Sequence, residues 1–297
     1  MRRGERSMVP RADFRSYYGR PILKQPTWEA RDIAGYLFLG GLAGASSTLA
    51  AGAHLTSRPG FARASKLGAL GAISLSTAAL VHDLGRPARF ANMLRVFKPT
   101  SPMSVGSWLL AAYAPAAGVA ATSAVSGRMR TLGSAATMGA GLLGPAVASY
   151  TAVLVANTAV PAWHAGHREL PFVFAGSAAS AAAGLALVAS PADEVGPAQR
   201  VAVAATIVEQ TALKRLKDNA GEVAETFEQG QAGNLLDVAS RLSVVGAIGA
   251  LFARRSRIAG AISGACLLTS SACTRFGIFA AGRASVADPK YVVKAQR

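Results

Sequence analysis

The sequence has few side chains that could hold a metal ion or a redox cluster. It contains two cysteines and four histidines in 297 residues. Cys266 and Cys273 lie in one apolar segment, where helical spacing separates them by roughly 10 Å along the axis, too far for a disulfide. Two thiolates are also too few for an iron–sulfur cluster, which usually takes about four. We therefore expect no metal in this chain and interpret both cysteines as packing residues.

Charged residues are also scarce, and most of them are basic. They make up 15% of the chain against 51% hydrophobic residues, and the net charge is +16. This composition is typical of integral membrane proteins. Because the basic residues lie between long apolar segments, and no basic stripe carries interleaved aromatic residues, they indicate orientation in a membrane and attraction to anionic headgroups. Membrane lipid is an expected partner, and nucleic acid is not.

Eight apolar segments meet or approach the roughly 20 residues that a helix needs to cross a bilayer. They are Ile33–Leu55, Leu67–Leu84, Ser104–Val125, Leu132–Ala156, Leu170–Ser190, Ala198–Leu213, Leu235–Ala253 and Ile258–Ala281. We predict an all-α integral membrane protein, an eight-transmembrane-helix bundle built as two four-helix halves. Small residues such as Gly40, Gly44 and Gly141 let membrane helices approach closely.

The segments divide the chain into three regions. A basic arm, residues 1–32, is predicted to dock a partner; the membrane domain covers 33–281, and a basic tail covers 282–297. An even number of spans places both termini on one face, which also carries most of the Lys and Arg residues. By the positive-inside rule we expect a multi-pass protein of the cytoplasmic (inner) membrane with both termini in the cytoplasm.

Four charged residues of the apolar segments are candidates for membrane depth: Glu209, Asp237, Arg241 and Arg275. Each costs roughly 2.5 to 3.5 kcal/mol at membrane depth, so each needs a partner or a function. Counted from the face with the termini, all four lie at depths of roughly 5 to 12 Å, and Asp237 and Arg241 can pair on one helix face. Two compatible interpretations stay open: an ion-pair network that joins the last three helices, and a proton path or anion-facing cluster.

The histidines favour proton transfer over haem binding. His82, His164 and His167 fall on the face with the termini, and His54 falls on the other. Haem b in a membrane bundle usually takes paired histidines at one depth, whereas these lie at segment ends or in loops, so we expect no haem. Imidazole titrates near neutral pH, so His82 beside Asp83 suits proton transfer. Histidines that merely lie at the interface are the alternative.

Three stretches resemble the NrfD/PsrC family, the membrane subunits of polysulfide-reductase-type complexes. They are YYGRPILKQPTWEARDIAGYLFLGGLAG at 17–44, HDLGRPARFANMLRVFKPTSPMSVGSW at 82–108 and SYTAVLVANTAVPAW at 149–163. The resemblance implies a subunit that is not catalytic alone, carries no haem or metal, and binds a quinone, menaquinone or ubiquinone. It also implies electron exchange with an iron–sulfur (ferredoxin-like) subunit, which serves a catalytic oxidoreductase subunit.

The resemblance and the charge pattern together select candidate site residues. Tyr150 matches the family's tyrosine that hydrogen-bonds a quinone carbonyl, and the entrance of the first span lies near the family's site. The candidate quinone-binding residues are Tyr150, Trp28, Glu29, Asp32 and His164, and the candidate catalytic residues for proton transfer are His82, Asp83, Glu209, Asp237, Arg241 and Arg275.

Two other functions stay open from the sequence. The intramembrane charges could line the path of a solute or ion transporter, although transporters often contain two repeated halves and no repeat is evident in this sequence. The chain could also be a membrane anchor with no redox site. If the chain is instead the quinone-binding subunit that the resemblance implies, the basic face is the docking face, and the redox partner is expected in the cytoplasm.

Overall fold

The computed structural model describes residues 23–26, 28–84 and 89–294, and all regular structure in this part of the chain is helical. Most of the predicted docking arm therefore lies outside the described residues. The eight long helices are α1 (Ala30–Leu55), α2 (Pro59–Asp83), α4 (Pro102–Ser126), α5 (Arg130–Ala156), α7 (Leu170–Ala189), α8 (Gly196–Asn219), α10 (Gly230–Ala250) and α11 (Arg257–Ala287). The short ones are α3 (Arg89–Asn92), α6 (Pro161–Ala165), η1 (Gly221–Ala224), α9 (Glu225–Glu228) and α12 (Pro289–Lys294).

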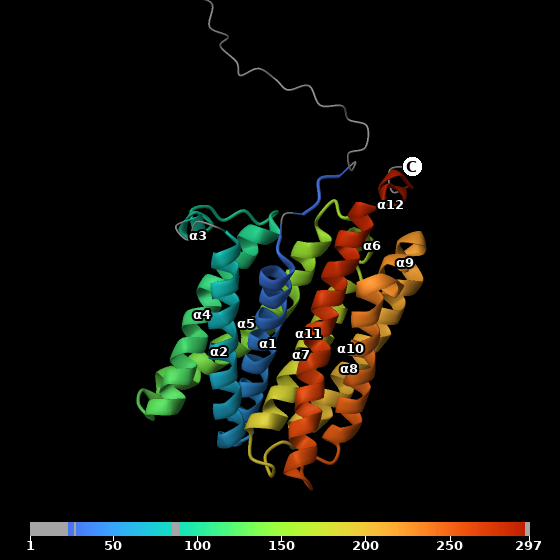
Figure 1. Cartoon of the computed structure of the whole chain (residues 1–297). Helices are drawn as coiled ribbons and strands as arrows, with labels where there is room; N and C mark the ends of the chain where they lie inside the picture. Colours follow the sequence, from blue (N-terminus) through green and yellow to red (C-terminus); the bar gives the residue numbers. More distant parts are fainter. Residues whose placement is uncertain (1–22, 27, 85–88, 295–297) are drawn as a thin grey trace, which may run out of the picture.

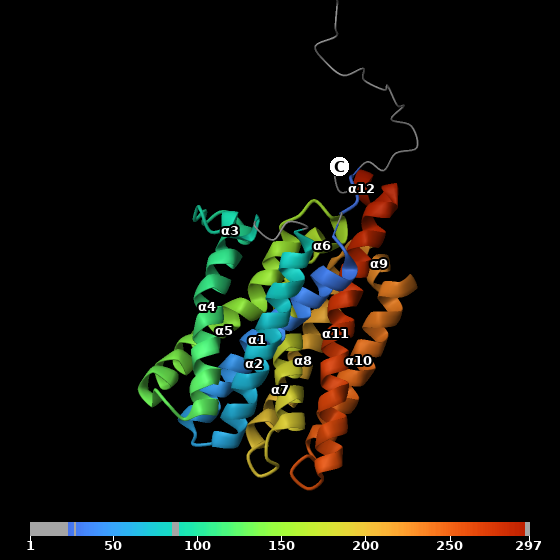
Figure 2. The same cartoon turned by 60° about the vertical axis from the view of Figure 1, so that its left-hand side comes forward.

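The long helices form one bundle in which successive members run in opposite directions (Figure 1). The short helices α3, α6, α9 and α12 lie at the end where α1 begins, which we call the terminal end (Figures 1 and 2). The connections α1–α2, α4–α5, α7–α8 and α10–α11 form the opposite end. Each apolar segment of the sequence coincides with one long helix, because a long apolar run is a local signal for a helix in a membrane.

Six of the long helices, α1, α2, α4, α5, α7 and α11, are long and apolar enough to cross a membrane. This is consistent with a multi-pass membrane protein that is all-helical in the described residues, and the count of eight spans stays a prediction. The exceptions are α8 and α10, which have similar lengths and lie beside candidate spans. Both are more polar: α8 carries Arg200, Glu209 and Arg215, and α10 carries Asp237 and Arg241. That α8 and α10 also cross the membrane stays a prediction.

The bundle consists of two four-helix halves with the same order of neighbours. In the first half, α1 contacts α2 and α5, and α4 contacts α2 and α5. In the second half, α7 contacts α8 and α11, and α10 contacts α8 and α11. Helices α1 and α7 join the halves, since they contact one another and α1 also contacts α11.

Glycines set the helix spacing at an equivalent crossing in each half. A Cβ atom at Gly44 of α1 would clash with the carbonyl oxygen of Gly144 on α5. A Cβ atom at Gly184 of α7 would clash in the same way with Gly264 on α11. A Cβ atom at Gly141 would also meet α1. The predicted close approach of small residues is therefore confirmed at Gly44 and Gly141, and the second half uses the same device.

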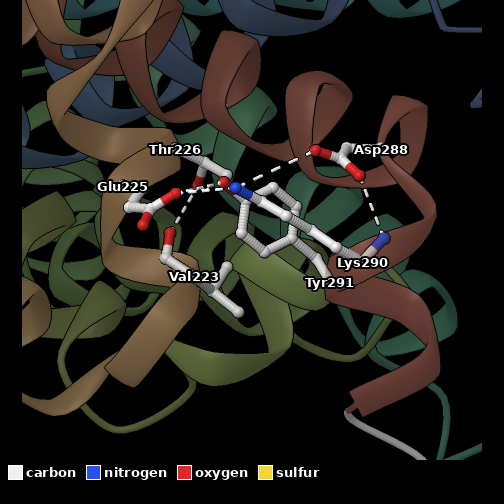
Figure 3. Close-up of polar contacts among 6 residues, drawn as sticks. All are labelled: Val223, Glu225, Thr226, Asp288, Lys290 and Tyr291. Carbon is white, nitrogen blue, oxygen red and sulfur yellow. Dashed lines mark hydrogen bonds and ion pairs between the residues drawn. The ribbon is translucent and has the colours of Figure 1, made fainter.

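The C-terminal helix α12 is held at the terminal end by polar contacts with α9 (Figure 3). Lys290 Nζ donates a 2.8 Å hydrogen bond to Glu225 Oε2, and the hydroxyl of Tyr291 donates to the same oxygen at 3.0 Å. Its hydrogen bonds with Glu225 and with Tyr291 raise the pKa of Lys290. The contacts place α12 beside the connection between α8 and α10.

Candidate functional site

The first turn of α1 and the last turn of α2 bring four of the predicted site residues together. His82 Nδ1 lies 2.7 Å from Asp32 Oδ2, and Asp83 interacts with the backbone of Glu29. An acidic residue in the first turn of a helix is favourable because the amide dipoles there are positive outward. We call Glu29, Asp32, His82 and Asp83 the α1–α2 cluster.

The α1–α2 cluster connects water with the interior of the bundle. The side chain of His82 is 77% exposed, whereas that of Asp32 is 13% exposed. The carboxylate of Asp32 contacts the imidazole of His82, and Glu29 and Asp83 add two carboxylates to the cluster, so it contains several groups that can exchange protons. This arrangement can accept a proton from a buried donor and release it to water.

A pair of tyrosine hydroxyls lies deeper on the same side of α1. Tyr36 follows Asp32 by four residues, so both occupy one face of α1, roughly 6 Å apart along the axis. The hydroxyls of Tyr36 and Tyr150 share a hydrogen bond in which either can be the donor. The ring of Tyr150 lies where a Cβ atom at Gly106 of α4 would clash with it. Helices α1, α4 and α5 therefore converge on this pair.

Trp28 belongs to an aromatic stack rather than to the α1–α2 cluster. Its ring stacks on Trp163 with centroids 5.9 Å apart, and Trp163 packs against Phe279 at 5.6 Å. The indole N–H of Trp163 donates to the carbonyl oxygen of Ile278 at 2.8 Å, and a side chain at Gly282 would clash with its ring. The stack fixes the segment before α1 against α6 and α11.

His164 lies apart from both groups. It is exposed on α6, its ring stacks on His167 at 5.7 Å, and its Nδ1 atom lies 3.3 Å from the carbonyl oxygen of Ala156. Among the described residues, no hydrogen bond or ion pair joins His164 to the α1–α2 cluster. Its predicted role in quinone binding therefore receives no support from side-chain contacts.

Glu209 and Arg275 form a buried polar group near the middle of the bundle, with exposed fractions of 1% and 0%. Glu209 Oε1 accepts a 2.8 Å hydrogen bond from Thr274 Oγ1. Arg275 Nη2 donates to the carbonyl oxygen of Phe174 at 2.8 Å, and the guanidinium carbon lies 3.7 Å from the centroid of the Phe174 ring. A Cβ atom at Gly41 would lie 3.2 Å from Arg275 Nη2, so α1 borders the group.

Three polar atoms of this buried group have no hydrogen-bond partner among the described residues: Glu209 Oε2, Arg275 Nε and Arg275 Nη1. No direct ion pair joins the two side chains in this part of the chain. Buried polar atoms without a partner destabilise a protein, so such atoms usually bind a water molecule or an ion, or serve a function.

Asp237 and Arg241 occupy a different environment. Both are exposed on the outer face of α10, and no ion pair joins them to each other among the described residues. The four intramembrane charges that the sequence places in one layer are thus divided into a buried pair, Glu209 and Arg275, and an exposed pair.

A family model described as "Polysulphide reductase, NrfD" matches residues 24–204, more than half of the chain. The chain belongs to the NrfD family. The match contains the α1–α2 cluster, the tyrosine pair and α7, and it ends within α8 before Glu209. Membership in the NrfD family indicates a membrane subunit of a redox complex. No curated protein matches the chain.

The described residues of this NrfD-family chain contain no group of three or more His, Cys, Asp or Glu side chains that could hold a metal ion. Cys266 and Cys273 are both free and half-buried on α11. The α1–α2 cluster and the tyrosine pair contribute carboxylates, an imidazole and phenols. These are groups that move protons and hydrogen-bond a carbonyl.

Sequence reasoning missed three residues that the structure makes central: Tyr36, Trp163 and Thr274. The signal for Tyr36 was present, because it follows Asp32 by four residues within a stretch that resembles the family. Trp163 closes another such stretch. Thr274 has no distinguishing local signal, since only the packing of α11 on α8 brings it to Glu209.

Proposed function

We propose that this chain is the quinone-reactive membrane subunit of a multi-subunit oxidoreductase. It binds a quinone or quinol near the terminal end, transfers protons there, and exchanges electrons with an iron–sulfur partner that serves a catalytic subunit. The observation that carries the proposal is that one face of α1 takes part in two hydrogen-bonded pairs about one turn apart: Asp32 with the exposed His82, and Tyr36 with Tyr150. All four side chains belong to the region that the family model matches.

The chemistry of quinones requires the kinds of group found in these two pairs. Oxidation of a quinol releases two electrons and two protons, and reduction of a quinone takes up the same. The electrons pass to or from the partner, whereas the protons need titratable groups that reach water. Because either hydroxyl of the tyrosine pair can be the donor, one remains able to donate to a quinone carbonyl. Asp32 and His82 then hold and release the proton at the terminal end.

Exposed apolar residues support partner docking at the same end. Val96 and Phe97, between α3 and α4, are 70% and 58% exposed. Phe97 packs edge-on against Trp108, which is itself 42% exposed, and Lys98 adds a charge. Apolar surface of this kind beside charge is typical of a protein interface. These residues lie on the connection between α2 and α4, which begins directly after His82 and Asp83 of the α1–α2 cluster.

The terminal end is proposed to face the cytoplasm, because it lies on the side richer in Lys and Arg. A reporter that is active only outside the cytoplasm, fused after Arg297, should then give no signal. A strong signal would reverse the orientation and place the docking surface outside the cytoplasmic membrane.

Solute or ion transport is the second candidate function. It is favoured by the unpartnered buried atoms of Glu209 and Arg275, which are the kind of groups that line a path for ions or protons. The two functions differ in what they require. Transport by the subunit alone in liposomes needs no quinol, whereas the proposed redox function needs both a quinol and the partner.

The decisive experiment measures quinol-linked electron transfer per assembled complex in Asp32→Asn and His82→Gln. Loss of a positioned acid or base should lower the rate by about 100- to 10,000-fold while assembly is retained. Asp83→Asn belongs to the same series, since its amide oxygen can still accept from the backbone of Glu29. If Asp83 has only this structural role, its variant assembles less well but turns over normally.

Matched controls lie at the opposite end of the bundle. His54→Gln and Asp193→Asn remove the same chemical groups from exposed positions there and should leave the rate unchanged. Wild-type turnover in both Asp32→Asn and His82→Gln would remove the quinone site from the α1–α2 cluster.

A further inference from the structure

A groove of about 420 Å³ lies between the first turn of α7 and the outer face of α8. This volume falls in the range of roughly 300 to 1,000 Å³ that small-molecule sites occupy. Neither the α1–α2 cluster nor the tyrosine pair borders it. The groove therefore calls for an occupant other than the proposed quinone.

The end of the groove nearest the terminal end is positively charged. Arg168, just before α7, and Arg215, in the last turns of α8, both border it and are exposed. Neither arginine has an ion pair or side-chain hydrogen bond with any described residue. The one carboxylate in the lining, that of Glu169, already accepts a 2.7 Å hydrogen bond from Asn219. Two guanidinium groups are thus free to bind an anion.

The deeper part of the groove is apolar. Phe172 of α7 and Ile207 and Val208 of α8 line it and are 63%, 61% and 46% exposed. Along α8, Ile207 lies roughly 12 Å from Arg215, on the side of the bundle centre. Because α7 is a candidate membrane span, its first turn lies at the membrane boundary. Charge at the boundary and apolar side chains below it match the polarity of a lipid.

We propose that this groove binds one anionic phospholipid, with its phosphate between Arg168 and Arg215 and an acyl chain along Phe172, Ile207 and Val208. Planar guanidinium groups bind phosphate oxygens with paired hydrogen bonds. A zwitterionic lipid adds its own cation beside the two arginines and gains less from them. The net positive charge of the lining therefore selects the anionic headgroup.

The experiment titrates the delipidated full-length chain in detergent with dioleoyl phosphatidylglycerol and, separately, with dioleoyl phosphatidylcholine, and counts bound lipid by native mass spectrometry. The first phosphatidylglycerol should bind about tenfold or more tightly than phosphatidylcholine, which has the same chains. Arg168→Gln/Arg215→Gln should remove this preference. Phe172→Ala should weaken the binding of both lipids.

The control variant Arg254→Gln/Arg255→Gln removes two exposed arginines from the opposite end and should keep the preference. Inorganic phosphate at a concentration equal to that of the lipid should not displace phosphatidylglycerol, since it offers the charge without the chain. Equal binding of the two lipids by the wild-type chain would overturn the proposal, and this comparison depends on no variant. Displacement by phosphate, or an unchanged preference in a folded Arg168→Gln/Arg215→Gln protein, would overturn it as well.

Discussion

The two halves of the bundle share one helix arrangement but treat their buried polar groups differently. In the first half, all four long helices are candidate membrane spans. Two pairs of its deep hydroxyls bind across helices, Tyr36 with Tyr150 and Ser47 with Tyr113 at 2.7 Å, whereas those of Ser46 and Thr151 have no partner among the described residues. Such neutral pairs satisfy hydrogen-bonding groups at modest cost.

The second half places a carboxylate and a guanidinium in its interior and leaves part of each without a partner. Two of its four long helices, α8 and α10, are too polar to qualify as candidate spans. The helix packing, in contrast, is alike in both halves: glycines allow close contact between the first and fourth long helices, α1 with α5 and α7 with α11. The comparison indicates that small residues determine how the helices pack in both halves. The buried polar groups can therefore differ between the halves without changing the helix arrangement.

The largest expected effect tests the second half. Arg275→Met removes the cation near the buried carboxylate of Glu209, with which it makes no direct ion pair. The carboxylate is then an uncompensated buried charge, which costs up to about 3 to 5 kcal/mol. The melting temperature of the purified protein in detergent should fall accordingly. Glu209→Gln/Arg275→Met should recover most of the loss, because neither charge then remains in the interior.

Lys66→Met provides the matched change in the first half. Lys66 is a half-buried cation of α2 with no ion pair in the described part of the chain. Its replacement should change stability by less than about 1 kcal/mol. If the Arg275→Met protein has the melting temperature of the wild type, the buried charges of the second half do not contribute more to stability than Lys66 does in the first.

A smaller effect is expected at the shared glycine crossings. Gly44→Ala and Gly184→Ala each force a methyl group against a facing backbone carbonyl, and overpacking of this kind costs about 1 to 3 kcal/mol. Gly52→Ala, on the same helix as Gly44, meets no atom within 4 Å and should stabilise slightly, because alanine favours a helix. Thermal melting of the three variants checks this. Tolerance of alanine at only one of the two crossings would show that the halves are not built alike.

The helices could be predicted from the sequence because the length of an apolar run is a local property. Several site residues, such as Asp32, His82 and Tyr150, could also be selected from the sequence, but which of them meet could not, since this depends on how each helix is rotated. Counting residues along a helix gave the depth of Asp237 and Arg241 but not the face they occupy, and both turn outward. In the same way, the sequence drew attention to Asp83 beside His82, whereas the hydrogen-bond partner is Asp32, 50 residues away.

The smallest expected effect separates the two tyrosine hydrogen bonds of the first half, Tyr36–Tyr150 and Ser47–Tyr113. Tyr150→Phe removes a hydroxyl that is proposed to act on a quinone carbonyl, and one net hydrogen bond is worth about 0.5 to 1.5 kcal/mol. Quinol-linked turnover per assembled complex should therefore fall by about two- to tenfold. Tyr113→Phe removes a more deeply buried hydrogen bond, to Ser47, and should lower stability without slowing turnover. Equal slowing by both variants would mean that the hydroxyls of this half act only through packing, and that the quinone carbonyl meets another donor.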